Sequence, residues 1–224
     1  MDKVLAFDTS TTYCSVALHL DGNIFQDETE AGRRHSELLL PMTQSVLNDA
    51  GLELTDLDGI AFGAGPGSFT GLRIACGVAQ GLAFATDLPI IGIGTLEAIA
   101  EQQTHDRVIV AMDARMGEIY HAAFVKKEHH WQIVSEPVLC QPQHAPVLSG
   151  SQWIGCGSGF DCYEQILSEY YGSDLLDIRH GCYPHAREIA QLAVARNIND
   201  FHTDPALASP LYIRNKVALK ESER

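Results

Sequence analysis

The sequence predicts an α/β protein made of two lobes of the same topology, each a βββαβα unit. The main observation is an internal repeat: an apolar strand that ends in an aspartate and a turn occurs at 4–8 and again at 108–113. In both halves this strand is followed by two further strands and then by alternating strands and helices. We therefore divide the chain into an N-terminal lobe, 1–104, and a C-terminal lobe, 105–224.

The elements of the first half follow from local signals. Asp21-Gly22 is typical of a two-residue hairpin turn, so the stretches on either side are expected to pair as strands. A helix is expected at 36–50 because apolar residues recur at helical spacing and Gly51 is suited to end it. Pro41 should kink this helix or mark its true beginning. The other elements expected here are strands at 14–20, 24–29, 60–62 and 89–93, a helix at 71–86 and a short helix capped by Thr95.

The second half restarts after a polar stretch at 103–106 and repeats the same order. The elements expected after Asp113 are strands at 119–125, 131–134, 153–154 and 175–178, helices at 160–170 and 184–195, and an extended segment at 206–213. A duplicated βββαβα unit is the plan of the actin, hexokinase and Hsp70 group, in which two lobes face each other. There, the aspartate that ends each lobe's first strand approaches the phosphates and metal of a nucleotide. For this chain the expectation is an analogy at the level of the fold.

Composition and charge limit the classes of function. The 224 residues are 46% hydrophobic and 20% charged, an ordinary globular composition that excludes a disordered or collagen-like chain. The 15 Lys and Arg residues against 29 Asp and Glu give a formal net charge of −14. Such a surface repels phosphate backbones, so any role in nucleic-acid chemistry is expected to pass through a partner.

Cysteine usage and hydropathy favour a reducing, aqueous compartment. The six cysteines include no CxxC pair and no zinc-ribbon spacing, and a structural disulfide stays open as the less favoured alternative. The N-terminal apolar run is too short for an export signal, and no stretch approaches the roughly 20 apolar residues of a membrane span. We therefore expect a cytoplasmic protein with free thiols and no membrane partner.

The densest motif is a glycine-rich loop, Gly63-Ala64-Gly65-Pro66-Gly67-Ser68-Phe69-Thr70-Gly71-Leu72-Arg73. Its glycines and proline fix a backbone path that few side chains could follow. Ser68 or Thr70 can cap the helix that follows and leave N–H groups at its positive end. Two interpretations stay equal: an anion site, or a tight strand-to-helix crossover without a ligand. The loop has no lysine and does not match G-x-x-x-x-G-K-[ST], which excludes a P-loop.

Two acidic turns, Asp8-Thr9-Ser10 and Asp113-Ala114-Arg115, occupy the positions where a phosphate site would lie. Each lacks the glycine that lets a backbone approach phosphate closely, so we expect a degraded phosphate turn or nucleotide site. The favoured interpretation is that both aspartates hold their turns by accepting backbone N–H bonds. A kinase-like site needs a metal-bound nucleotide, hydrogen-bond donors and a base, and only parts of that set are present.

The two helices of the first half carry more apolar surface than one core needs. Gly77, Gly81 and Ala85 form an almost side-chain-free face, and a glycine inside a helix costs about 1 kcal/mol relative to alanine. Close approach of another helix, within the lobe or from another subunit, is expected to offset that cost. The run 38–40, three leucines, covers more of its helix than a single buried stripe requires. We interpret this layer as a docking surface for a helical partner.

Other candidate sites are weaker. The run Gly155-Cys156-Gly157-Ser158-Gly159 follows a strand and precedes a helix, but a turn is favoured over a dinucleotide site. The ten histidines include no His-x-x-x-His pair, and no serine lies in a G-x-S-x-G elbow. The sequence therefore predicts no metal site and no catalytic residue.

Four motifs together resemble a known family. They are Asp8-Thr9-Ser10, the run from Gly65 to Arg73, Asp113-Ala114-Arg115-x-Gly117-Glu118-x-Tyr120 and Pro210-Leu211-Tyr212-Ile213-Arg214. In order and spacing they resemble the bacterial TsaB (YeaZ) family. The resemblance implies the duplicated actin/Hsp70/hexokinase-like (ASKHA) fold and a partnership with a larger paralogue, TsaD, and with the ATPase TsaE. Together these proteins attach a threonylcarbamoyl group to N6 of the adenosine 3′ of the anticodon, in tRNAs reading codons that begin with A.

The resemblance also implies which chain performs the chemistry. In TsaD a His-x-x-x-His pair holds the catalytic metal, whereas here His35 has no second histidine four residues on. The chain is therefore expected to be a non-catalytic scaffold or activator with no cofactor of its own. ATP and the metal of TsaD are used by the complex, and tRNA is reached indirectly. The rival functions are an ATP-dependent phosphotransferase and, less favoured, a metallopeptidase.

The expected TsaD interface lies on the helices at 35–50 and 71–85, and the same surface is expected to form a homodimer when TsaD is absent. Its residues are His35, Leu38, Leu39, Met42, Val46, Arg73, Gly77, Gly81 and Ala85. On this hypothesis Leu39→Asp or Gly81→Leu breaks the pairing and leaves the monomer folded. The basic tail from Arg214 onward is expected to be a solvated terminus rather than an RNA contact.

Overall fold

The computed structural model describes residues 1–128 and 130–214, and the tail beyond Arg214 lies outside them. The described strands form two five-stranded sheets. The first has the order β3-β2-β1-β4-β5 and contains β1 (Lys3–Asp8), β2 (Tyr13–Leu20), β3 (Asn23–Glu30), β4 (Gly59–Gly65) and β5 (Ile90–Gly94). The second has the order β8-β7-β6-β9-β10 and contains β6 (Arg107–Arg115), β7 (Glu118–Lys127), β8 (His130–Cys140), β9 (Trp153–Cys156) and β10 (Leu175–Arg179).

The two sheets share one topology. In each, the first three strands are antiparallel neighbours, and the fourth lies parallel to the first, as β1 pairs with β2 and β4, and β6 with β7 and β9. The fifth strand then joins the fourth in parallel. This equivalence confirms the repeat expected from the two Asp-ended strands: the chain has the duplicated, two-lobed α/β fold of the actin group.

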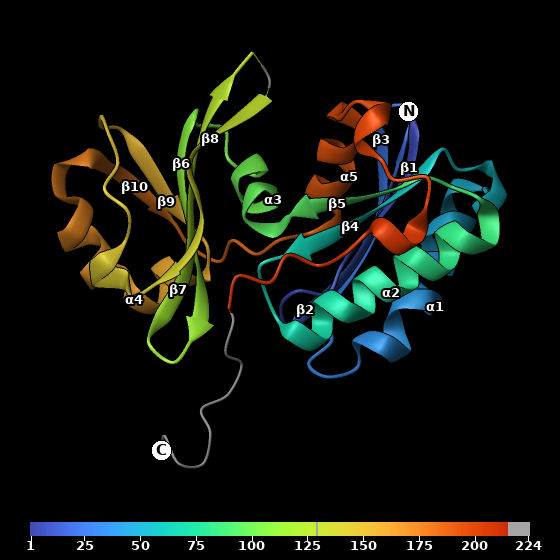
Figure 1. Cartoon of the computed structure of the whole chain (residues 1–224), viewed down its shortest axis with the longest axis horizontal. Coiled ribbons are helices and arrows are strands. Elements are labelled where there is room, and N and C mark those ends of the chain that lie inside the picture. The colour runs from blue at the N-terminus through green and yellow to red at the C-terminus, as the bar shows by residue number, and fades with distance from the viewer. Residues whose placement is uncertain (129, 215–224) are drawn as a thin grey trace.

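Helices cover both sheets and fill the space between them (Figure 1). They are α1 (His35–Ala50), α2 (Phe69–Thr86), α3 (Thr95–Glu101), α4 (Ser158–Tyr171) and α5 (Ala186–Ala195). In order along the repeat α2 corresponds to α4 and α3 to α5, whereas a short 3₁₀ turn at Pro142–His144 follows β8 where α1 follows β3. None of the helices in the described ranges is long and apolar enough to span a membrane.

Successive side chains of each strand point to opposite faces of its sheet, and the apolar ones form three cores. In β1, Leu5 and Phe7 pack with α1 and α2, while Val4 and Ala6 face a central core that also contains α3 and α5. In β6 the same alternation sends Ile109 toward α4 and its neighbours toward the central core. The central core therefore joins the two lobes through packed side chains.

The last part of the chain returns to the first lobe. Helix α5 packs on β1, β2 and β4, and the Ala186 N–H donates to Ser15 Oγ at 2.8 Å. Farther on, His202 and Ile90 exchange two backbone hydrogen bonds of 2.8 and 2.9 Å. The division at residue 104 stays a prediction, and the structure adds that elements beyond it complete the first lobe.

Several local signals act as expected, and two do not. Asp21 and Gly22 have φ values of 48° and 83° in the β2–β3 turn, and Gly51 ends α1 with a φ of 68°. Helix α1 runs through Pro41 from His35, so the proline does not mark the beginning of this helix. Strand β8 extends well past the expected end at residue 134, because its pairing with β7 continues to Cys140.

Candidate functional site

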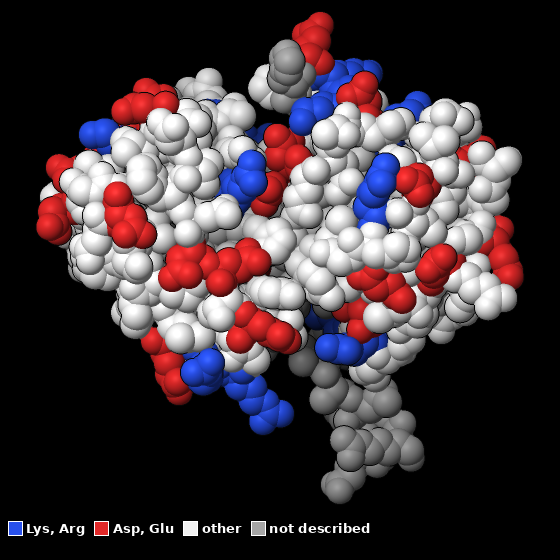
Figure 2. Space-filling model, turned by 180° about the vertical axis from the view of Figure 1, so that it is seen from behind, with Lys and Arg blue, Asp and Glu red and all other residues white. Residues whose placement is uncertain are grey.

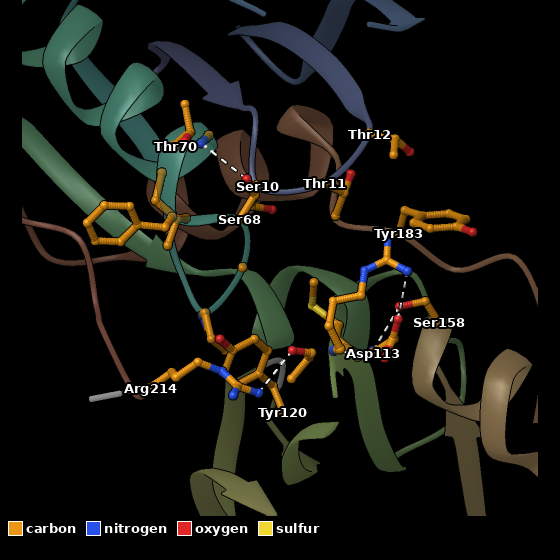
Figure 3. Close-up of a pocket in the computed structure, with 18 of the residues that line it drawn as sticks. Ser10, Thr11, Thr12, Ser68, Thr70, Asp113, Tyr120, Ser158, Tyr183 and Arg214 are labelled. Carbon is orange, nitrogen blue, oxygen red and sulfur yellow. Dashed lines mark hydrogen bonds and ion pairs between the residues drawn. The ribbon is translucent and has the colours of Figure 1, made fainter. Parts of the chain in front are cut away.

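A cavity of about 780 Å³ lies between the two lobes. Its walls come from the β1–β2 turn, the start of α2, the end of β6, the start of α4 and the segment before Arg214 (Figure 3). Ser10, Thr11 and Ser68 reach it from the first lobe, and Asp113 and Ser158 from the second. Seen from behind the view of Figure 1, the surface carries acidic side chains over both lobes, with basic side chains among them (Figure 2).

Asp8 is held behind the cavity wall. Its side chain is 1% exposed and is not among the lining groups. Oδ1 accepts hydrogen bonds from Ser10 N at 2.9 Å and Ser10 Oγ at 2.8 Å, while Oδ2 has no partner among the described residues. Burial raises the pKa of Asp8 to about 7, against the Ser10 hydrogen bonds that lower it. Asp8 therefore holds the turn, as the favoured interpretation expects.

The glycine-rich loop packs directly on this turn. Ser68 N donates to Ser10 O at 2.7 Å, and Thr9 Oγ1 donates to Gly71 O at 2.7 Å. A Cβ on Gly71 would lie 1.8 Å from the carbonyl oxygen of Thr9, so only glycine permits this approach. Ser68 also caps α2 by accepting the Gly71 N–H at 3.3 Å. Two backbone N–H donors near the start of α2 are therefore already used, that of Ser68 by Ser10 O and that of Gly71 by the Ser68 hydroxyl, which favours the tight crossover over the anion site.

The second acidic turn does face the cavity. Asp113 Oδ1 accepts from Arg115 N at 2.9 Å, and Oδ2 pairs with the Arg115 guanidinium at 3.2 Å. The backbone N–H of Asp113 donates to Ser158 Oγ at 3.1 Å, which fixes the turn against the start of α4. The geometry reproduces that of the first lobe, with an aspartate holding its own turn.

The residues present do not fit a metal-bound phosphate. Of the two aspartates expected at such a site, Asp8 is buried behind the cavity wall. Asp113 is engaged through both oxygens, by Arg115 and by the Tyr163 hydroxyl at 3.4 Å from Oδ1. Across residues 1–128 and 130–214, no group of three or more His, Cys, Asp or Glu is arranged to hold a metal ion. The cavity has the volume for a small molecule, but Asp113, the acid that lines it, is engaged by the protein.

A C-terminal segment, 211–214, closes one side of the cavity. Leu211 N donates to Ala64 O at 2.7 Å in the first lobe. Arg214 then pairs with Glu118 at 2.7 Å and donates to Ala114 O at 3.0 Å in the second lobe. Its motif was visible in the sequence, but no local pattern shows that this segment bridges the lobes.

Four of the residues expected at the partner interface are buried, which is a correction: three lie in the core of the first lobe, and His35 lines the cavity. The exposed fractions are 6% for His35, 0% for Leu39, 6% for Met42 and 1% for Val46. Leu39, Met42 and Val46 recur at helical spacing and form the stripe of α1 that packs on the first sheet. The surplus leucine of the run is Leu40, which is 50% exposed, and Leu38 is half-buried.

The other expected interface residues do lie on an open surface. Arg73, Gly77, Gly81 and Ala85 are exposed along α2, and a Cβ built on either glycine meets no atom within 4 Å. Phe84 lies beside this stripe and is 81% exposed. We call the set Arg73, Gly77, Gly81, Phe84 and Ala85 the α2 face. Nothing within the described chain packs on its two glycines, so packing inside the lobe does not account for them.

Comparison with known proteins identifies the family. The family described as "TsaD: tRNA N6-adenosine threonylcarbamoyltransferase" matches residues 28–219. The chain is 36% identical to the tRNA threonylcarbamoyladenosine biosynthesis protein TsaB of Escherichia coli, over 98% of this chain and 97% of that protein. For the TsaB of Haemophilus influenzae the identity is 38%, over 97% and 96%. The chain belongs to the TsaB (YeaZ) family.

Solved structures of the TsaB (YeaZ) family agree with the fold described above. A structure of YeaZ from Pseudomonas aeruginosa superposes with a TM-score of 0.84 at 34% sequence identity, covering 95% of this chain and all of that chain. A second structure from the same organism, described as similar to peptidase YEAZ, gives a TM-score of 0.85. The two-lobed architecture is therefore that of the family.

Proposed function

We propose that this chain acts in tRNA threonylcarbamoyladenosine biosynthesis as a non-catalytic subunit that docks on TsaD through the α2 face. The observation that carries the docking is the pair Gly77 and Gly81, open on an exposed helix where glycine costs about 1 kcal/mol each relative to alanine. A glycine stripe lets a partner helix approach to short interaxial distance, which larger side chains prevent. The exposed ring of Phe84 beside it adds apolar area for such a contact.

The engaged acids support a role without catalysis. Asp8 is buried in its turn and Asp113 is paired with Arg115, so neither is free to hold a nucleotide's metal. The sequence also lacks the His-x-x-x-His pair that, by the family resemblance, holds the metal in TsaD. On this proposal the metal and ATP belong to TsaD and TsaE.

Charge supports an indirect relation to tRNA. A formal net charge of −14 disfavours a direct grip on phosphates, because nucleic-acid affinity rests mostly on phosphate neutralisation. In the proposed complex the partners bind tRNA and TsaE hydrolyses ATP. Without TsaD, two copies of the chain pair through the α2 face by two-fold symmetry.

The test is a reconstitution with TsaD, TsaE, tRNA, threonylcarbamoyl-adenylate and ATP, run with and without this chain. We expect modified tRNA only when the chain is present. Gly81→Leu should abolish co-elution with TsaD and the modification, while the variant stays folded because the added side chain enters open space. Gln165→Leu, on the exposed surface of α4, is the matched control and should leave both intact. Full modification without the chain, or undiminished pairing of Gly81→Leu, contradicts the proposal.

A second experiment distinguishes the scaffold function from the rival phosphotransferase function. Asp113→Asn should keep pairing and modification, because the partners of the carboxylate, Arg115 and the Tyr163 hydroxyl, belong to the chain itself. Calorimetry of the isolated chain with Mg-ATP should show no binding. Loss of modification in Asp113→Asn with pairing intact, or tight Mg-ATP binding that this variant abolishes, would establish a working nucleotide site instead.

A further inference from the structure

The segment 208–214, which we call the strap, runs from the side of α2 to the second lobe (Figure 1). At its beginning, the carbonyl oxygen of Ala208 accepts a hydrogen bond from Gln80 Nε2 of α2 at 2.9 Å. Leu211 N then donates to a carbonyl oxygen of β4, and Arg214 reaches the second lobe. The strap is therefore attached to both lobes, and its last four residues line the interlobe cavity.

One side chain connects the strap to the α2 face. Arg73 Nε donates to the Tyr212 hydroxyl at 3.0 Å, and the guanidinium carbon lies 3.9 Å from the centre of the Phe69 ring. The Tyr212 ring packs on the same phenylalanine, with ring centres 5.3 Å apart. A guanidinium over an aromatic ring is a favourable contact. Because Arg73 belongs to the α2 face, the proposed docking surface and the strap share this residue.

The two terminal nitrogens of Arg73 are open to a partner. In the described part of the chain neither Nη1 nor Nη2 has a hydrogen-bond or ion-pair partner, and the side chain is exposed. Arg73 is the one charged residue of α2, in a chain with a formal net charge of −14. A helix that covers Gly77 and Gly81 therefore meets an unpaired cation beside the glycine stripe. The group that complements a guanidinium in such a contact is a carboxylate, which two N–H donors can bind together.

We propose that Arg73 binds a carboxylate of the docked partner and, once paired, holds the strap closed over the interlobe cavity. The inference rests on the proposed function, because the partner is the protein that docks on the α2 face. A carboxylate on the two terminal nitrogens leaves Nε on the Tyr212 hydroxyl and fixes the guanidinium over Phe69. An arginine that is already ordered loses less conformational entropy when it binds Tyr212. Docking and closure of the strap therefore favour each other.

The Leu211 amide reports whether the strap is closed. Its N–H donates to Ala64 O at 2.7 Å, directly before Tyr212 in the chain. An amide bonded in this way exchanges its hydrogen with solvent when the bond opens, so the exchange rate measures how often the strap is released. Mass spectrometry with fragmentation at single-residue resolution follows this amide both in the free chain and in a complex.

The first measurement is made on the free, full-length chain. Tyr212→Phe removes the hydroxyl that accepts from Arg73 and keeps the ring, and we expect it to speed exchange at Leu211 about fivefold. Tyr170→Phe is the matched control, because its hydroxyl donates to Ala145 O in the second lobe. This variant should exchange Leu211 at the wild-type rate. An unchanged rate in Tyr212→Phe overturns the proposal, since the bond from Arg73 then does not hold the strap.

The second measurement adds TsaD in excess. Exchange at Leu211 should slow by about fivefold or more in the wild-type chain. Tyr212→Phe should still co-elute with TsaD, because the glycine stripe is intact, but it should not gain this protection. Equal protection in Tyr212→Phe means that TsaD merely covers the strap, and it overturns the inference. Co-elution of the wild type without any slowing also overturns it and leaves the docking standing. A wild-type chain that does not co-elute with TsaD refutes the docking, and the coupling with it.

The carboxylate is tested by removing the charge of Arg73. Arg73→Gln should bind TsaD about tenfold more weakly at low salt, and the difference from the wild type should shrink as salt is added, because salt screens an ion pair at a surface. Arg187→Gln, a change of the same kind on an exposed side chain of α5, is the control and should bind as the wild type does. Equal binding of Arg73→Gln and the wild type at low salt shows that no carboxylate meets Arg73 and overturns the proposal.

Discussion

At the scale of single residues, Asp8 occupies the position expected of a phosphate-site aspartate, but its carboxyl group is buried and does not line the cavity. The carboxyl group ends β1, as a phosphate-facing aspartate of this fold would, but the Ser10 hydrogen bonds turn it into a structural group. Its second oxygen is buried without a hydrogen bond, a costly arrangement for a charged carboxylate. Residue types alone could not show this, because Gly63 of β4 lies against the Asp8 carboxyl group and His185 lies nearby, and both are far away in the sequence.

The raised pKa of Asp8 makes a prediction about stability and pH. The folded state holds the proton up to about pH 7, whereas the ordinary carboxyl value is 3.8, so the folded state binds the proton more tightly. Stability from this group is then present at low pH and lost as pH rises toward 7, by at most about 4 kcal/mol. Asp8→Asn cannot ionise, so the melting temperature of the variant relative to the wild type should rise between pH 5 and pH 8.

Asp49→Asn, an exposed change in α1, is the control for removing one negative charge from this acidic chain. Its melting temperature relative to the wild type should vary less over the same pH range. His185 and Glu28 form an ion pair near Asp8 and are left unchanged in both variants. If the melting temperature of Asp8→Asn relative to the wild type does not change between pH 5 and pH 8, the pKa of Asp8 is not raised in the folded state.

At the scale of elements, helical periodicity located α1 correctly but did not decide which leucine faces the sheet. The run 38–40 places one leucine in the core, one at its edge and one in solvent. Three adjacent leucines leave the helix face undecided, and only packing against the first sheet resolves it. Helix α2 divides its small residues between two faces: Ala75, Ala79 and Ala83 lie in the core, whereas Gly77, Gly81 and Ala85 are exposed.

Leu39 and Leu40 provide a matched pair on this helix. Leu39→Ala removes a side chain that is 0% exposed, and we expect it to lower the free energy of unfolding by about 2–5 kcal/mol. Leu40→Ala removes one that is 50% exposed, and should change it by about 0.5 kcal/mol or less. Chemical denaturation of both variants measures the difference. Equal losses would mean that the orientation of α1 given above is wrong.

At the scale of the whole molecule, the duplication was predictable and the way the halves interlock was not. The repeat shows in sequence because each strand that ends in Asp8 or Asp113 is a local pattern. The return of α5 to the first sheet and the bridge from Leu211 to Arg214 are long-range contacts. No periodicity encodes contacts of this kind, so the sequence division at residue 104 suggests more independence than the packing gives.

Because α5 and the segment after it pack on the first lobe, we predict that residues 1–104 do not fold stably alone. Without α5, the apolar side chains of β1 and β2 that face the central core, including Val4, Ala6 and Ala17, lose their cover. A fragment that exposes this much apolar surface should aggregate, or bind a hydrophobic dye and melt without cooperativity. Circular dichroism, dye fluorescence and light scattering of the fragment, with the full chain as control, measure this. A monomeric fragment with a sharp melting transition would show that the first lobe needs neither α5 nor the segment that follows it, and that the central core forms only after the lobe has folded.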